Sequence, residues 1–237
     1  MIGSSKERGF SSPPNKMGGQ ECPRSHEFLD PFAPIEQHQH RLPHWQQGAV
    51  YYFVTWRLAD SLPREKLERL NEERAVWNRL HPRPWDEDTE FEYHKKFSTA
   101  VDNWLDAGNG CCVLRNPDLA AIVFDVLLHF DGKRYAMDAF VVMPNHVHVL
   151  FRLLASNHLE SVVQSWKGFS ARQINRQLGK YGRLWQPDYW DRLIRNEGHL
   201  LKCLEYIQEN PIKAKLPQNQ YRLFVREKER GFSNPQS

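Results

Sequence analysis

The sequence has few cysteines, little net charge and no long apolar segment. Its four cysteines include no CxxC pair, and the adjacent Cys111 and Cys112 are a poor disulfide candidate. We therefore expect reduced thiols and a reducing compartment. No stretch approaches the roughly 20 apolar residues that a membrane span requires, and the first residues lack the apolar segment of a secretory signal. These absences together predict a cytoplasmic protein without membrane contact.

The formal net charge is +3 and the isoelectric point is near 8.6. Such a weakly basic balance permits a nucleic-acid partner but does not require one. Hydrophobic residues make up 40% of the chain and aromatic residues 12%, which indicates a folded protein with a real core. A length of 237 residues suits one domain with appendages.

Changes in composition divide the chain into three parts. Residues 1–44 are rich in Ser, Pro, Gly, Gln and His, and are predicted to be a mostly disordered tail. Residues 45–220 carry the periodic apolar patterns of one folded domain, with an acidic helical insert at about 60–110. Residues 221–237 are expected to form a charged C-terminal tail.

Strands and helices are predicted from apolar periodicity and from helix-capping residues. The expected strands are Val50–Leu58, Cys111–Leu114, Tyr135–Met143 and His146–Leu153. Helices are expected to begin at Pro63 and at Asn116, and to span Leu159–Leu178 and Gly198–Asn210, with Pro211 ending the last one. The alternation indicates an α+β fold in which helices pack on one face of an antiparallel sheet.

Two histidines stand at a spacing that can serve a metal ion. His146 and His148 lie in the same predicted strand, where residues two apart point to the same face. Imidazole is a frequent ligand of divalent metals, and two aligned rings cost little entropy to organise. The spacing alone also fits a pair of ordinary strand histidines. His38 and His40 show the same spacing without a predicted strand, and we assign them no role.

The last predicted helix offers a nucleophile and an oxygen ligand. Tyr206 and Asn210 are four residues apart and therefore share one face of the helix. A phenol, with a pKa near 10, becomes a useful nucleophile when a metal polarises the phosphoryl group that it attacks. Asn210 could be the third metal ligand, although Glu209 is a rival for ligation or for the phenol proton. A structural tyrosine beside a helix-capping asparagine is the plainer alternative.

Basic and aromatic residues between the two motifs suggest a surface for single-stranded nucleic acid, because cations bind phosphates and rings stack on bases. The helix over 159–178 carries few acids after Glu160, and an aromatic loop follows it. The alternative is that the tryptophans anchor the loop to the core. The candidate DNA-binding residues are Lys167, Arg172, Arg176, Arg183, Trp185, Arg192, Arg195 and Lys213.

Three segments, taken in order, resemble the REP-associated tyrosine transposases, a branch of the HUH single-tyrosine transposase superfamily that is IS200-like. They are Val141–Leu150 with the sequence VVMPNHVHVL, Leu184–Asn196 with LWQP and YWD, and Tyr206–Ala214 with YI and NPIKA. The resemblance covers roughly residues 45–220. The stretch 60–110 exceeds the compact family core, and the sequence after Leu216 departs from the family ending.

The resemblance implies a ferredoxin-like (RRM-like) fold of the HUH endonuclease type and a divalent metal, Mg or Mn. It implies that His146 and His148 are the metal-binding histidines, that Asn210 is the third ligand and that Tyr206 is the nucleophile. It further implies cleavage and rejoining of hairpin-containing, REP-like single-stranded DNA through a 5′-phosphotyrosine. It favours a monomer over a dimer and a nucleoid-associated protein in the cytoplasm.

Two other functions compete with DNA cleavage. A domesticated protein could retain the fold and bind DNA hairpins without cutting them, although the intact set of His146, His148, Tyr206 and Asn210 argues against this. A small metallo-oxidoreductase or hydrolase could use the histidine pair alone, but the basic helix argues against that class. DNA cleavage is therefore the function that we expect.

Overall fold

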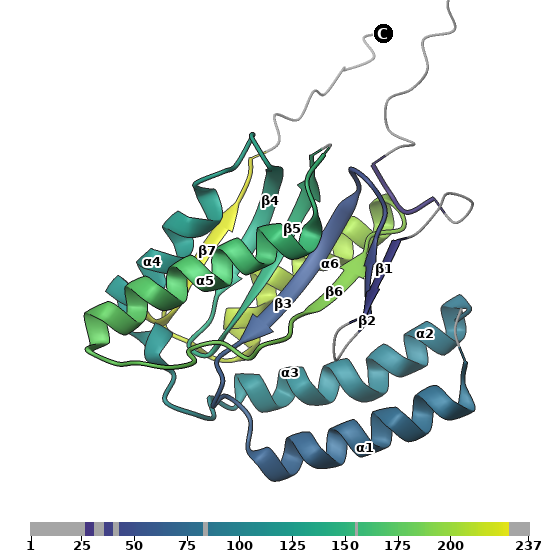
Figure 1. Cartoon of the computed structure of the whole chain (residues 1–237), viewed down its shortest axis with the longest axis horizontal. Coiled ribbons are helices and arrows are strands. Elements are labelled where there is room, and N and C mark those ends of the chain that lie inside the picture. The colour runs from purple at the N-terminus through teal and green to yellow at the C-terminus, as the bar shows by residue number, and fades with distance from the viewer. Residues whose placement is uncertain (1–26, 31–35, 40–42, 83–84, 155, 228–237) are drawn as a thin grey trace, which may run out of the picture.

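The computed structural model describes residues 27–30, 36–39, 43–82, 85–154 and 156–227 of the chain, and Figure 1 shows how their elements are arranged. The strands are β1 (Glu36–Gln39), β2 (Pro43–Gln46), β3 (Tyr51–Arg57), β4 (Tyr135–Val142), β5 (His146–Leu153), β6 (Trp190–Leu193) and β7 (Arg222–Val225). The α-helices are α1 (Arg64–Leu80), α2 (Glu87–Tyr93), α3 (Thr99–Asp106), α4 (Pro117–Leu128), α5 (Leu159–Leu178) and α6 (Glu197–Lys213). A π-helical turn, η1 (His94–Ser98), joins α2 to α3, and η2 (Val113–Arg115) and η3 (Gln218–Gln220) are 3-10 turns.

The centre of the molecule is a five-stranded antiparallel sheet with the strand order β6-β3-β5-β4-β7. With the insert left aside, the elements β3, α4, β4, β5, α5 and β6 follow one another as βαββαβ, and their strands lie in the order 4-1-3-2. This is the ferredoxin-like arrangement. The α+β class and the ferredoxin-like fold predicted from the sequence are therefore confirmed.

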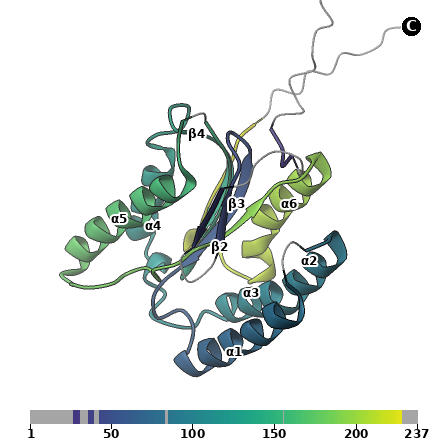
Figure 2. The ribbon, with the colours of Figure 1, turned by 45° about the vertical axis from the view of Figure 1, so that its right-hand side comes forward.

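The sheet is covered by helices on both faces (Figure 2). One face carries α4 and α5, where Trp56 stacks on Trp166 with ring centroids 5.9 Å apart. The other face carries α6, whose Ile207 is buried against Phe53 and Leu150. The prediction of helices on one face holds for α4 and α5, and α6 is the exception. Because strand side chains alternate between faces, β5 supplies Val147 and Val149 to the first face and Leu150 to the second.

The insert at about 60–110 is helical, as predicted, and its helices pack around an aromatic cluster of their own. Tyr93 and Phe97 are buried there with ring centroids 4.9 Å apart. Trp77 completes the cluster, with its ring edge-on to Phe97 at 5.8 Å. Figure 1 shows α1, α2 and α3 together beyond one end of the sheet. Near the C-terminal end of α3, Leu105 O accepts a hydrogen bond from Asn145 Nδ2, directly before β5, and this contact places the insert at the candidate site described below.

Both terminal segments contain structure that the sequence did not predict. Residues 1–26 and 228–237 lie outside the described residues, so the predicted tails are not tested there. Within the predicted N-terminal tail, β1 and β2 pair as an antiparallel hairpin, and the backbone N–H of Leu29 donates to Ile194 O at 2.9 Å. At the other end, β7 pairs with β4 and forms an edge of the sheet. Paired strands therefore occur on both sides of the span 45–220.

Two local predictions are wrong. Cys111–Leu114 was expected to be a strand, but η2 begins at Val113 because Cys112 adopts a left-handed backbone conformation with φ of 46°. Helix α6 was expected to end before Pro211, yet it runs to Lys213 with Pro211 inside it. The N–H of Ala214 donates to Asn210 O at 3.0 Å, so the last turn closes beyond the proline. The strand β6 was not predicted.

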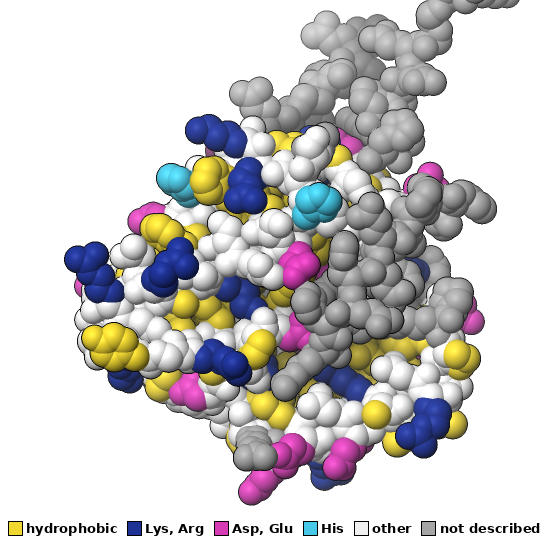
Figure 3. All heavy atoms as spheres, viewed as in Figure 1, with side chains coloured by type: hydrophobic (Ala, Val, Ile, Leu, Met, Phe, Trp, Pro, Cys, Tyr) yellow, Lys and Arg dark blue, Asp and Glu magenta, His cyan; other side chains and the backbone are white. Residues whose placement is uncertain are grey.

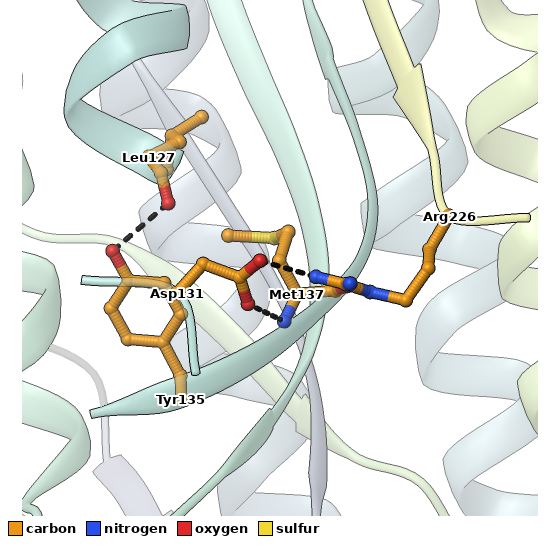
Figure 4. A network of polar contacts seen from close by, with 5 residues as sticks. All are labelled: Leu127, Asp131, Tyr135, Met137 and Arg226. Atoms are coloured by element: carbon orange, nitrogen blue, oxygen red, sulfur yellow. Dashed lines mark hydrogen bonds and ion pairs between the residues drawn. The ribbon is translucent and has the colours of Figure 1, made fainter. Parts of the chain in front are cut away.

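A polar network fastens β7 and the α4–β4 turn to the sheet (Figure 4). The Asp131 carboxylate accepts the backbone N–H of Met137 at 2.9 Å and forms an ion pair with Arg226. Arg226 also donates from Nε to Met137 O at 2.6 Å. The Tyr135 hydroxyl donates to Leu127 O at 2.9 Å and so holds the end of α4.

Within the described residues, no helix is both long and apolar enough to cross a membrane.

Candidate active site

The two histidines begin strand β5 in the middle of the sheet. His146 pairs in register with Arg57 of β3, and His148 pairs with Thr55. Both side chains are 0% exposed and point to the face that α6 covers, as Leu150 does at the next even position. Their ring centroids are 4.7 Å apart, with an angle of 78° between the ring planes. The sequence prediction that these imidazoles lie side by side is therefore confirmed.

Neighbouring side chains orient each ring through its Nδ1 atom. His146 Nδ1 lies 2.7 Å from Asn145 Oδ1. Asn145 Nδ2 donates to Leu105 O at 3.0 Å and to Asn109 O at 3.1 Å, so the amide orientation leaves Oδ1 as an acceptor. His146 must therefore carry its proton on Nδ1 and present an unprotonated Nε2. His148 Nδ1 lies 2.7 Å from the Thr55 hydroxyl, which can donate or accept, so this contact orients the ring without selecting its tautomer.

Both Nε2 atoms are buried, and neither has a hydrogen-bond partner within the described structure. Burial lowers the pKa of His146 to about 3, against an opposing contribution from Asn210. Burial, followed by the neighbouring His146, lowers the pKa of His148 well below its ordinary value. Both imidazoles are therefore neutral at physiological pH. A neutral imidazole with a free ring nitrogen is the form that binds a metal ion.

Helix α6 brings Tyr206 and Asn210 against the histidines. The helix begins at an asparagine cap, where Asn196 Oδ1 accepts the N–H of His199 at 2.8 Å. One side of α6 is apolar and packs on the sheet, so residues at intervals of three and four face β5. The Tyr206 ring lies edge-on to His148, with centroids 5.1 Å apart. Asn210 is 2% exposed, and its Oδ1 has no partner within the described structure.

The rival residues on this helix and in the aromatic loop point elsewhere. Glu209 forms an ion pair with Lys213 at 2.8 Å. Tyr189, the alternative nucleophile, is buried in the cluster beneath α4 and α5, on the opposite face of the sheet. The geometry therefore favours Tyr206 and Asn210 over these two residues.

The donor atoms around the histidines fit a divalent metal ion. Two imidazole nitrogens and one amide oxygen face this site without hydrogen-bond partners within the described structure, as the Tyr206 hydroxyl does. A set of nitrogen and oxygen ligands suits Mn²⁺ and related ions. In the part of the chain that the structure describes, no cluster of three His, Cys, Asp or Glu side chains could hold a metal. A metal at this site would therefore need the amide of Asn210 as its third protein ligand, leaving further positions open to substrate and water.

The insert adds charged groups that sequence reasoning did not assign to the site. The carboxylates of Asp102 and Asp106, one turn apart on α3, act on Tyr206: burial and then these two negative charges raise the pKa of the phenol above its ordinary value. Arg192 of β6 completes the group, since its positive charge lowers the pKa values of both Asp102 and Tyr206. In the sequence, the one indication of Asp102 and Asp106 is that two acids stand four residues apart on a helix that also has an apolar face.

Two of the predicted DNA-binding residues are instead structural. Lys167 is 9% exposed, and its ammonium donates to Pro187 O at 2.8 Å and to Asp188 O at 3.1 Å. Trp185 is 4% exposed, and its Nε1 donates to Ser170 Oγ at 3.0 Å. Both side chains are therefore engaged within the protein, which supports the alternative that the loop is anchored to the core, and their contact with DNA stays a prediction.

The remaining predicted DNA-binding residues lie in two groups. Arg192 is partly buried over the Trp190 ring at 4.7 Å, and Arg195 is also partly buried. The exposed members are Arg172, Arg176, Arg183 and Lys213. Figure 3 shows Lys and Arg side chains on the α5 side of the molecule. An exposed basic strip therefore exists along α5 and the loop after it.

Comparison with known proteins places the candidate site inside a recognised region. Residues 122–210 match the family model described as "Transposase IS200 like", and this range contains His146, His148, Tyr206 and Asn210. The REP-associated tyrosine transposase of Escherichia coli (strain K12) is 28% identical over 81 residues, which cover 34% of this chain and 47% of that protein. A Haemophilus influenzae relative is 29% identical over 85 residues, covering 32% of this chain and 48% of its own length.

The resemblance to the REP-associated tyrosine transposases is thus confirmed, and the chain spans about half the length of the curated relatives that it matches. A solved structure described as a REP-associated tyrosine transposase bound to a REP hairpin aligns with 74% of this chain and 73% of its own. Its TM-score is 0.35 and its sequence identity is 18%.

Proposed function

From the match of residues 122–210 to the IS200-like transposases, we propose that this protein is a metal-dependent enzyme that cleaves and rejoins hairpin-containing single-stranded DNA. One observation carries the proposal. Three buried metal-donor atoms, on His146, His148 and Asn210, have no hydrogen-bond partner within the described structure, and the Tyr206 ring packs against the ring of His148. Burying polar atoms without partners costs free energy, and a bound ion would recover it.

The metal is Mg or Mn, held by His146, His148 and Asn210. When bound, it supplies a positive charge that polarises the scissile phosphate. The two Nδ1 contacts, to Asn145 and Thr55, hold the orientation of both imidazole rings.

Tyr206 is the nucleophile in this proposal. Its phenolic oxygen bonds to the phosphorus as the bond from phosphorus to the 3′ oxygen breaks, which leaves a 5′-phosphotyrosine and a free 3′-hydroxyl. The reverse reaction, with a DNA 3′-hydroxyl as attacker, rejoins the strand. The phosphotyrosine retains the bond energy, so the cycle needs no nucleotide cofactor.

The DNA partner follows from the exposed basic strip and from the relatives. Arg172, Arg176 and Arg183 can contact phosphates along α5 and its following loop. One structurally aligned protein is described as bound to a REP hairpin, and we extend hairpin binding to this chain as part of the proposal. Because the histidines and Asn210 are buried in the free protein, strand entry requires local opening around α6.

The test is direct trapping of the covalent intermediate. Purified protein is incubated with Mn²⁺ and a labelled pool of hairpin-bearing single-stranded DNA, then separated on a denaturing gel and mapped by mass spectrometry. We expect a protein–DNA adduct on Tyr206 that is lost with EDTA, in Tyr206→Phe and in His146→Ala. Tyr221→Phe, a change at a partly buried tyrosine outside the site, is the matched control and should retain the adduct.

Two results would contradict the proposal. An adduct that persists in Tyr206→Phe would remove Tyr206 from its role. Tight hairpin binding without an adduct on any tyrosine would instead indicate a protein that binds DNA hairpins and does not cut them.

A further inference from the structure

The nucleophile faces a helix of the insert as well as the ferredoxin-like core. Helix α3 places Asp102 and Asp106 one turn apart on the side that faces α6. The Tyr206 hydroxyl is shielded from solvent and lies close to the Asp102 carboxylate, although the pair does not close a regular hydrogen bond. The insert therefore reaches the atom that is proposed to react.

Asn145 fixes the position of α3, and the same side chain orients His146, a proposed metal ligand. Asn145 holds the end of α3 through two hydrogen bonds, to Leu105 O at 3.0 Å and to Asn109 O at 3.1 Å. The same side chain holds His146 through Oδ1 at 2.7 Å. Leu105 is 1% exposed, so the contact between α3 and Asn145 is buried. This end of α3 is thus tied to β5, and Asp102 lies one turn before the tie.

A cation from a third element stands beside Asp102. Arg192 of β6 lies over the Trp190 ring at 4.7 Å, and its positive charge acts on both Asp102 and Tyr206. Burial raises the pKa of Asp102 to about 6, against the opposing effects of Tyr206 and Arg192. Such a carboxylate is ionised at neutral pH, yet it is a stronger base than an exposed aspartate, which is the condition under which a general base works well.

We propose that Asp102, supplied by the insert and held beside Arg192, receives the proton of Tyr206 during strand cleavage. This inference rests on the proposed function, because it requires Tyr206 to be the nucleophile. In the step, the Tyr206 oxygen–phosphorus bond forms and the phosphorus–3′ oxygen bond breaks. The phenol proton passes to the Asp102 carboxylate, and the departing 3′ oxygen takes a proton from water. In the rejoining step Asp102 returns its proton to the phenolate of Tyr206.

The experiment compares single-turnover adduct formation in the full chain, using Mn²⁺ and the hairpin-bearing DNA pool, with hairpin affinity measured separately. We expect Asp102→Asn to slow adduct formation on the order of 10²-fold, the usual contribution of a general base, while the dissociation constant of the hairpin changes less than about threefold. Asp102→Ala should be slow to the same degree, and added formate should partly restore its rate, because formate can occupy the vacated space and accept the proton. Asp88→Asn, an exposed acid on α2, is the control and should retain the wild-type rate.

Each outcome distinguishes between different roles of Asp102. If the wild type forms the adduct but Asp102→Asn is equally fast, or if formate restores nothing in Asp102→Ala, Asp102 is not the proton acceptor and the proposed function stands. If Asp102→Asn is faster than wild type, the carboxylate blocks the place of the scissile phosphate, and the inference is overturned in favour of an inhibitory contact. If the wild type forms no adduct at all, the proposed function fails and this inference fails with it.

Discussion

At the scale of single residues, Asn145 connects parts of the chain that local sequence keeps separate. Its amide nitrogen binds carbonyls at the end of the insert, and its amide oxygen fixes the proton on His146 Nδ1. The imidazole therefore presents its free nitrogen without needing a second carboxylate or hydroxyl for orientation. The position directly before the first histidine thus determines the tautomer of His146 and holds the end of the helix that carries Asp102.

The buried acid beside Tyr206 has a cost in stability that depends on pH. The pKa of Asp102 rises from 3.8 to about 6 on folding, so the folded state binds more protons than the unfolded state between these values. Stability is therefore lost as the pH rises through this window, and the full cost is present above pH 6. We expect Asp102→Asn to raise the free energy of unfolding by about 1–3 kcal/mol at pH 7.5, with the difference vanishing below about pH 4.

Thermal or urea unfolding of both proteins across pH 3.5–8 checks this prediction. A stability difference that is the same at every pH would show that Asp102 does not titrate as described. Together with the activity test above, a more stable but slower Asp102→Asn variant is the expected combination, since catalytic groups are often held at the expense of stability.

At the scale of elements, helix α5 has two different faces. Its buried side packs Trp166 and Ile174 on the sheet, and its exposed side carries Arg172 and Arg176. Lys167 belongs to the buried side and holds the following loop through two carbonyls. The basic residues of this helix therefore include exposed arginines, for which we propose DNA contact, and one lysine with a structural role.

The exposed arginines of α5 should govern the salt dependence of DNA binding. We expect the double change Arg172→Gln and Arg176→Gln to weaken single-strand affinity and to reduce the slope of log K against log salt by about 1.4, or about 0.7 for each lost phosphate contact. Fluorescence anisotropy with a labelled hairpin between low and moderate salt measures the slope. The exposed pair Arg69→Gln and Arg79→Gln on α1 is the control, and an equal effect there would indicate unspecific attraction instead of a defined strip.

The last strand depends on one arginine for its attachment. Arg226 pairs with Asp131 and donates to Met137 O, but its side chain is 42% exposed, so solvent weakens the ion pair. We expect Arg226→Ala to lower the free energy of unfolding by about 1 kcal/mol and to speed amide exchange in β7. Arg69→Ala, which removes the exposed Arg69–Glu73 pair, should change stability by less than about 0.5 kcal/mol. Equal losses in the two variants would show that the β7 network adds nothing beyond a surface pair.

At the scale of the whole molecule, the two faces of the sheet have separate tasks. The face beneath α4 and α5 holds most of the large apolar side chains, including Trp56, Phe140 and Trp166. The face beneath α6 holds the histidines, Tyr206 and Asn210 among a smaller set of apolar residues. The larger core therefore supports the sheet, while the unpartnered atoms of His146, His148 and Asn210 lie on the opposite side.

A substitution at Trp185 tests whether the α4 and α5 face serves stability. The sequence around Trp185 suggested DNA contact, but the side chain lies in the core of this face. The ring lies edge-on to Trp56 with centroids 6.1 Å apart. We expect Trp185→Ala to lower the free energy of unfolding by about 3–5 kcal/mol, measured by denaturant titration, while the salt slope of DNA binding stays unchanged below the melting temperature. Trp185→Phe should lose much less. A variant that melts normally but no longer binds DNA would reassign Trp185 to the DNA surface.

Local pattern was enough to predict much of this protein. Alternation in 146–153 placed the two histidines on one face, and the four-residue spacing of Tyr206 and Asn210 placed both on one side of a helix, because strand and helix periods are properties of the backbone. The same periods predicted an α+β fold with an antiparallel sheet, and the family resemblance implied its ferredoxin-like form. They did not predict β7 or the course of α6 through Pro211, where pairing with β4 and packing on the sheet outweigh local preference.

Only the tertiary structure decided which side chains meet. Thr55 reaches His148 across 93 residues of sequence, and Asn145 reaches Leu105 across 40, so no local period could pair them. Residue type did not predict burial either. Lys167 and Trp185 are of residue types that often contact DNA, yet both side chains are buried within the protein. The sequence alone determined that an HxH strand and a Tyr-x3-Asn helix exist. Folding determined that they share one face of the sheet and that Asp102 from the insert lies beside Tyr206. These residues are far apart in the sequence, and packing between distant segments leaves no local pattern from which their contact could be predicted.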